Sequence, residues 1–153
     1  MGRQVRMVIP GWQHPKDENG AYFPLCNDYF ADKFDWDEAV KIKGIIGAIE
    51  WFGSEPQPEN YMPDWADFEA THYMMYEDTT EGTPISPAFA TPEELAHWLA
   101  DNGASSFGSR TASYEQWLST IKRGYAISAM IAPRRGLMSG VEFGDGDWNE
   151  KLR

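Results

Sequence analysis

The stretch TPEELAHWLADNG, residues 91–103, carries the clearest structural signal in the chain. Thr91 is a typical N-cap, and Pro92 suits the first helical position because the backbone N–H it lacks would have no partner there. The apolar residues that follow recur at helical spacing: Leu95, Trp98 and Leu99. Because Asn-Gly then gives a stop, the stretch predicts a helix with one apolar face that packs against another layer.

A second helix is predicted immediately after the Gly- and Ser-rich loop 103–113. Ser113 and Gln116 have the spacing of a capping box, in which each side chain bonds the other residue's backbone N–H. An apolar stripe follows at helical spacing: Tyr114, Trp117, Leu118 and Ile121. The run Lys-Arg-Gly at 122–124 is typical of a helix end, where cations face the negative end of the dipole.

A third helix is predicted over residues 36–52. Asp35 and Glu38 have capping-box spacing, and Gly53 suits the C-terminal stop. Apolar residues again recur with a helical period: Trp36, Ala39, Ile42, Ile45, Ile46, Ile49 and Phe52. Gly44 and Gly47 each cost about 1 kcal/mol relative to alanine inside a helix, so we expect them to allow a close backbone contact.

The strand signals lie in shorter apolar segments. Residues 71–77 (THYMMYE) predict a strand buried on both faces, and residues 83–89 predict an edge strand because their prolines cannot donate to a ladder. Residues 125–131 and 137–143 predict two more strands. Together with about three helices, these segments predict an α+β fold with a small, mainly antiparallel sheet.

Length and composition predict one compact domain over residues 1–153. Within it, the Pro-rich segment 54–67 is expected to be a long loop and residues 144–153 a loose tail. Cys26 is the single cysteine, which excludes an internal disulfide framework. No apolar run has the length of a signal peptide core or a membrane span, so a cytoplasmic protein with no membrane partner is expected.

The charge of the chain is concentrated in its middle. Thirteen Lys and Arg against 24 Asp and Glu give a net charge of −11, which argues against direct binding to nucleic acid phosphates. Residues 44–109 contain no Lys or Arg at all. We expect some of the carboxylates in and around this segment to form one exposed acidic face that attracts cationic partners: Glu55, Glu59, Asp64, Asp67, Glu69, Glu77, Asp78 and Glu81. The competing interpretation is a solvated surface that only maintains solubility.

Motifs for catalysis or cofactor binding are missing from the sequence. There is no Gly-x-Ser-x-Gly elbow, no phosphate-binding loop and no calcium loop. The histidines at 14, 72 and 97 are interpreted as structural, and no catalytic residue, metal or cofactor is expected. The loop 103–113 is rich in backbone donors before a helix N-terminus, so Ser109, Arg110 and Thr111 are a candidate anion site.

Several segments resemble a module of small proteins encoded by bacteriophages and prophages. They are EDTTEGTPISPAF (77–89), TPEELAHWL (91–99), NGASSFG (102–108) and SYEQWL (113–118), with WQHPKDENG (12–20) near the amino end. The resemblance implies a viral origin and hence the cytoplasm of an infected bacterium. It supplies no catalytic residues.

Three hypotheses for function remain open at this stage. The first is an acidic accessory protein that binds a basic host protein and inhibits a nucleic-acid-directed defence machine, of the anti-CRISPR or anti-restriction type, by mimicking a polyanion. The second is a small enzyme in which Arg110 holds an anionic substrate beside His72 or Glu77. The third is a phage structural or replication adaptor anchored by exposed tryptophans.

Overall fold

The computed structural model describes residues 2–77, 82–132 and 134–143. Contacts separate the chain into two compact units, whereas the sequence predicted one domain. We call residues 24–64 the α1 unit and the remainder, residues 1–23 and 65–153, the sheet unit. The elements in chain order are β1 (Arg3–Val8), α1 (Tyr29–Phe52), the 3-10 turn η1 (Pro58–Asn60), β2 (His72–Glu77), β3 (Thr83–Pro84), α2 (Pro92–Asp101), α3 (Tyr114–Arg123), β4 (Tyr125–Ala126), β5 (Ala129–Ala132), β6 (Gly136–Ser139) and α4 (Gly140–Phe143).

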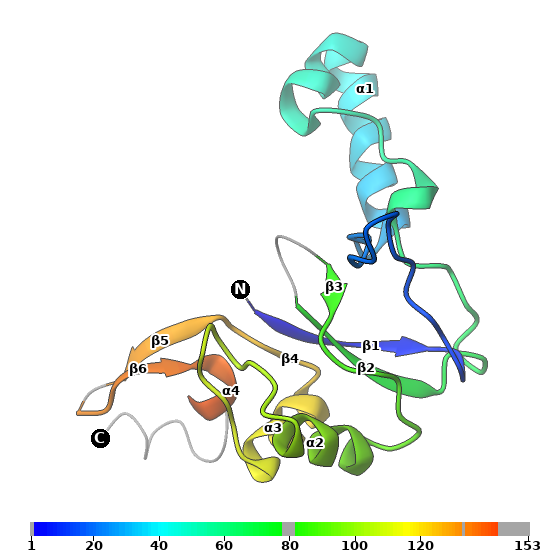
Figure 1. Cartoon of the computed structure of the whole chain (residues 1–153). Coiled ribbons are helices and arrows are strands. Elements are labelled where there is room, and N and C mark those ends of the chain that lie inside the picture. The colour runs from blue at the N-terminus through cyan, green and yellow to red at the C-terminus, as the bar shows by residue number, and fades with distance from the viewer. Residues whose placement is uncertain (1, 78–81, 133, 144–153) are drawn as a thin grey trace. The chain divides into compact units, whose positions relative to one another are not determined.

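The sheet unit is built on four antiparallel strands in the order β3-β2-β1-β4, with β5 and β6 forming a separate hairpin (Figure 1). Across the central pair, Val5 lies opposite Met75 and Arg6 lies opposite Met74. Because successive side chains point to opposite faces, these two pairs belong to different faces of the sheet. The predicted α+β fold with a mainly antiparallel sheet is confirmed.

Helices α2 and α3 lie together on the Met75 face of the sheet (Figure 1). Their predicted caps are confirmed, since Thr91 Oγ1 accepts from Glu94 N at 3.2 Å and Ser113 forms the full capping box with Gln116. The buried residues between these helices and the sheet form the main core: Met75, Leu95, Ala96, Leu99, Trp117, Ile121, Ala126 and Val141.

Three strand predictions need correction. The expected strand 125–131 is divided into β4 and β5. Between them, Ser128 O accepts from Gly140 N, the first residue of α4, at 3.3 Å. The expected strand 137–143 ends at Ser139, whose hydroxyl accepts from Glu142 N at 3.1 Å and thereby caps α4. The predicted edge strand keeps only two residues, with Pro84 at the sheet edge as expected.

Helix α1 begins seven residues before the predicted start. Asp28, not Asp35, is the N-cap, and its carboxylate accepts from Ala31 N at 3.3 Å. The predicted stop is confirmed, because Gly53 has a φ of 85° and its N–H donates to Ile49 O at 2.8 Å.

Gly44 breaks α1 into two helical parts. Its φ of 73° and ψ of 174° lie in a region that is essentially restricted to glycine. The helix therefore bends there, and Trp36 and Phe52 meet with ring centroids 6.5 Å apart. The close contact expected at Gly44 is wrong, since an added Cβ would meet nothing within 4 Å; at Gly47 it would lie 2.5 Å from Lys43 Cβ.

Candidate functional site

The sheet unit contains a cavity of about 500 Å³, whose lining includes Met74 of β2 and Trp98 of α2. Loop 10–23 forms one wall, and the segment after β3 forms another. The lining combines aromatic and apolar side chains with polar groups: Gly11, Trp12, Gln13, His14, Lys16, Tyr22, Met74, Pro84, Ile85, Ser86, Pro87, Ala88 and Trp98. A volume of this size lies in the range of small-molecule sites.

A buried hydrogen-bond chain fixes the wall of the cavity. The indole Nε1 of Trp12 donates to Tyr76 Oη at 3.2 Å, and Tyr76 Oη lies 2.9 Å from His14 Nδ1. At the other side of the imidazole, Nε2 lies 2.6 Å from Phe23 O. Because that carbonyl can only accept, Nε2 carries the proton, and Nδ1 accepts from the Tyr76 hydroxyl.

The two titratable side chains of this hydrogen-bonded group, His14 and Tyr76, both favour their neutral forms. Burial lowers the pKa of His14, an effect to which the nearby charge of Arg6 adds and which the hydrogen bond to Phe23 opposes. Burial also raises the pKa of Tyr76. The Arg6 guanidinium lies 4.4 Å from the Tyr76 ring centroid, a cation–π contact that favours its charged form.

We expect acidification to destabilise the fold through His14. The pKa of a histidine in the unfolded chain is about 6.5, and in the folded chain that of His14 is lower. Below about pH 6.5 the unfolded state therefore binds more protons, and the free energy of unfolding falls as the pH drops toward the folded pKa. Differential scanning calorimetry from about pH 7.5 to 5.5 measures this slope.

The variant His14→Gln isolates this contribution. At neutral pH it is expected to lose about 1–3 kcal/mol, because it disrupts the buried hydrogen bonds to Tyr76 and Phe23. Its stability should then vary less with pH than that of the native chain. His97→Gln, which changes an exposed histidine of α2, serves as the matched control. Equal slopes for the native chain and His14→Gln would contradict the assignment.

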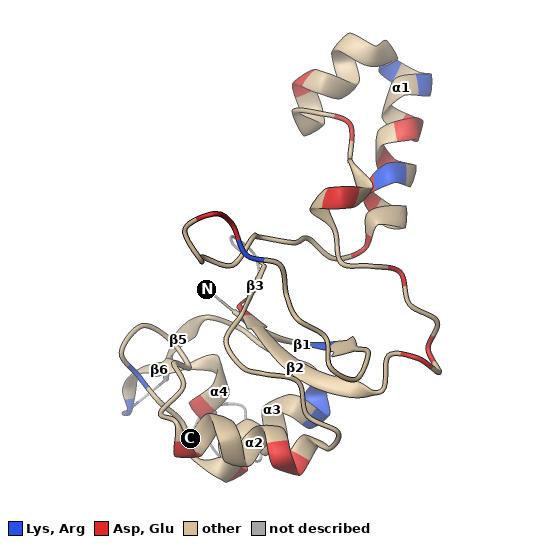
Figure 2. Cartoon of the chain, turned by 45° about the vertical axis from the view of Figure 1, so that its right-hand side comes forward, with Lys and Arg blue, Asp and Glu red and all other residues tan. Residues whose placement is uncertain are grey.

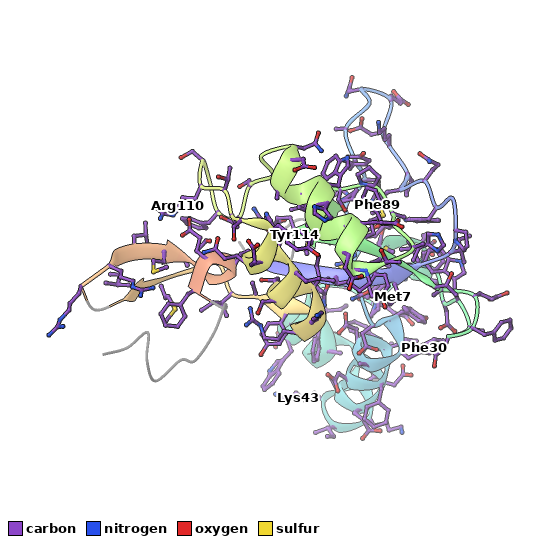
Figure 3. All side chains as sticks on the ribbon, turned by 90° about the horizontal axis from the view of Figure 1, so that it is seen from below. Met7, Phe30, Lys43, Phe89, Arg110 and Tyr114 are labelled. Atoms are coloured by element: carbon purple, nitrogen blue, oxygen red, sulfur yellow. The ribbon has the colours of Figure 1, made fainter. Side chains whose placement is uncertain are left out.

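The α1 unit presents a different kind of surface. Its buried apolar residues are few: Leu25, Trp36 and Ala48. Its exposed large apolar residues are many, and most lie on α1, where Phe30 and Lys43 are labelled in Figure 3. They are Phe30, Phe34, Ile42, Ile45, Ile46, Ile49, Trp51 and Phe52.

A shallow hollow of about 320 Å³ also lies on the α1 unit. Asp32 and Glu55 contribute carboxylates to its lining, and Phe52 and Tyr61 contribute rings. The Tyr61 hydroxyl donates to Asp32 Oδ2 at 2.7 Å, while Lys33 Nζ lies 2.7 Å from Glu55 Oε1. Burial, and secondarily this hydrogen bond, raise the pKa of Tyr61, which therefore stays protonated as a donor.

The predicted acidic face is divided between the two units. Glu55, Glu59 and Asp64 belong to the α1 unit, whereas Asp67 and Glu69 belong to the sheet unit. Glu55 is already paired with Lys33, and Glu69 accepts from Ala66 N at 3.2 Å. The remaining members are Glu77, treated next, and Asp78 and Glu81, which lie outside the described residues.

Glu77 is not part of an exposed face, which corrects the prediction. It is 5% exposed and lies opposite Arg3 in the β1–β2 register. Burial lowers the pKa of Arg3, and the negative charge of Glu77 raises it again. The two opposite charges therefore compensate each other. The sequence alone placed Glu77 among surface acids because strand β1, which carries its counter-charge, was not predicted.

The predicted anion loop also needs correction. Arg110, labelled in Figure 3 on the loop between α2 and α3, places its Nε 3.0 Å from Glu142 Oε2. Ser109 and Thr111 are exposed beside it. A carboxylate therefore already pairs with Nε of this guanidinium, and neither Arg110, His72 nor Glu77 is among the residues that line the cavity or the hollow.

Sequence reasoning missed the cavity, although it singled out two of its members. The sequence indicates a structural role for His14, and Trp12 enters only within the stretch 12–20 that carries the resemblance. The density of aromatic and turn residues over 12–23 is the signal that could have found it. The opposite wall could not be assigned, because it depends on how β1 pairs with β2.

Within the described ranges, no three His, Cys, Asp or Glu side chains gather closely enough to hold a metal ion. In the same part of the chain, no helix is both long and apolar enough to cross a membrane. Scans against protein-family models, curated proteins and solved structures found no match.

Proposed function

We propose that this chain is a phage-encoded accessory protein that binds a basic host protein through its α1 unit and inhibits a nucleic-acid-directed defence machine. The anti-CRISPR or anti-restriction class is the one we favour. The observation that carries the proposal is the apolar surface of the α1 unit, which exposes eight large side chains.

The α1 unit has too small a core to account for its fold. Units of about 40 residues rarely fold without a disulfide, a metal or a partner, and this one buries only three apolar residues among those described. After the bend at Gly44, Ile45, Ile46 and Ile49 are all exposed within about one helical turn, and contiguous apolar patches mark interaction sites in soluble proteins. A partner protein that covers them would supply the missing burial.

Charge favours a basic partner. Nine carboxylates against three lysines leave the α1 unit with a formal charge of −6, and Figure 2 shows acidic positions along α1 and the segment that follows it. The carboxylate of Asp32 lines the 320 Å³ hollow, where a lysine or arginine of the partner would find a counter-charge. Apolar contacts ringed by charge are typical of protein interfaces.

A cleavage assay with purified defence enzymes tests the proposal. A panel of CRISPR effector complexes and restriction endonucleases is assayed for DNA cleavage with and without the protein, at low and high salt. We expect inhibition of at least one enzyme, and we expect added salt to weaken it because the encounter is between opposite charges.

Charge-reversal variants locate the surface responsible. Glu59→Lys with Asp64→Lys should weaken inhibition, while Glu93→Lys with Glu94→Lys makes the same charge change on α2 and should not. Glu55 is left unchanged because its reversal would also break the pair with Lys33. Absence of inhibition across the panel, or migration of the protein with purified virions, would count against the proposal and favour an adaptor.

A further inference from the structure

We infer that the 500 Å³ cavity of the sheet unit is a binding site for a small planar aromatic compound that carries one anionic group. This site lies in the other unit from the surface discussed above, and the inference does not depend on the proposed function. Its volume falls within the range of about 300–1,000 Å³ that small-molecule sites occupy.

The aromatic part of the ligand is indicated by two tryptophans that are held in place. Trp12 is fixed by its hydrogen bond to Tyr76 and by an edge-on contact with Trp65, at a centroid distance of 4.8 Å. Trp98, on α2, packs against Phe89 at 6.2 Å. Because these rings are already ordered, binding a planar ligand against either of them costs little side-chain entropy of the protein.

The anionic part is indicated by the charge of the lining. In a chain with a net charge of −11, Lys16 is the single charged side chain among the described residues that line the cavity, and none of these described residues carries a carboxylate. The carboxylate of the adjacent Asp17 is used within its own loop, where Oδ1 accepts from Asn19 N and Ala21 N. Among the described residues, Lys16 is therefore the charged group that a ligand in the cavity would meet.

Lys16 is also held at the rim. It pairs with Tyr22 as an antiparallel bridge, and Phe23 N donates to Pro15 O at 2.9 Å, so the loop folds as a small hairpin. The Lys16 ammonium lies 4.9 Å from the Tyr22 ring centroid. Loop 15–23 thus presents a cation next to an aromatic ring at the mouth of an aromatic cavity, which suits a phosphate or carboxylate attached to a base or indole.

Titration of the full chain with named probes tests the site. The probes are AMP and indole-3-acetate as aromatic anions, adenosine as the uncharged counterpart and inorganic phosphate as the anion alone. The indole N–H signals of Trp12 and Trp98 are followed by NMR, and affinities by calorimetry. We expect saturable shifts with at least one aromatic anion and, if AMP is that ligand, affinity for it about fivefold above adenosine.

Two pairs of variants make the test specific. Lys16→Gln should remove the preference for the charged ligand, while Lys122→Gln on α3 should keep it. Ala88→Phe fills the cavity and should abolish the shifts, while Ala90→Phe places the same group on a nearby exposed residue and should preserve them. No saturable shift with any aromatic anion at millimolar concentration, or an unchanged preference in Lys16→Gln, would overturn the inference.

Discussion

Trp117→Ala is expected to lower the free energy of unfolding by about 3–5 kcal/mol, the range for deleting a buried large aromatic side chain. Trp117 lies on α3 and is fully buried in the cluster that joins α2, α3 and β2. No neighbouring side chain can fill its volume without leaving its own place in that cluster. Since small proteins have a total stability of about 5–15 kcal/mol, this one change removes a large fraction of it.

Urea unfolding followed by circular dichroism measures the effect. Phe68→Ala removes a large aromatic group of the same unit that is 82% exposed, and its change should stay within about 0.5 kcal/mol. A loss below about 1 kcal/mol for Trp117→Ala would mean that the cluster is not the core that supports the sheet unit.

The helices of the sheet unit could be predicted because their signals are local. Each helix has its cap, Thr91 or Ser113, within one or two turns of its apolar stripe. The structure shows both caps where the sequence predicts them. Helix α1 was predicted less well. Asp35 and Glu38 have the pattern of a capping box, but the aromatic residues before them extend the helix back to Asp28.

Strand β1 and the cavity could not be predicted for a physical reason. Arg3 and Arg6 are buried on a strand, which contradicts the rule that charged side chains face solvent. They are tolerated because Glu77 and the Tyr76 ring lie beside them across 70 residues of sequence. The sequence does not show that Arg3 and Arg6 have partners on β2. It therefore could not predict that Glu77 is buried or that His14 lies in the wall of a cavity.

The exposure of the apolar residues on α1 could not be predicted from the sequence either. Isoleucines at helical spacing are typical of a helix that packs into a core, and the sequence supports that interpretation. The bend at Gly44 changes the outcome, because Trp36 and Ala48 take up the small interior while Ile45 and Ile46 remain outside. These isoleucines, which helical spacing alone would assign to a core, are therefore available for a partner.

Ile46→Asp is expected to abolish inhibition of the defence enzyme in the cleavage assay while leaving the fold intact. Ile46 is 76% exposed, so its loss costs the free protein little beyond the lower helix propensity of aspartate, about 0.7 kcal/mol. Where the partner covers Ile46 with apolar groups, the new carboxylate would be desolvated, and we expect a loss of at least 2 kcal/mol, about 30-fold in affinity.

The matched control for Ile46→Asp is Ile131→Asp, which makes the same change at an 80% exposed isoleucine of β5 in the sheet unit. It should inhibit like the native protein. Sedimentation of the protein alone distinguishes a host partner from a second copy, because a dimer that Ile46→Asp converts to a monomer would assign this surface to self-association. A desolvated apolar contact does not tolerate a new charge. Equal inhibition by both variants would therefore show that the exposed face of α1 around Ile46 is not in the interface.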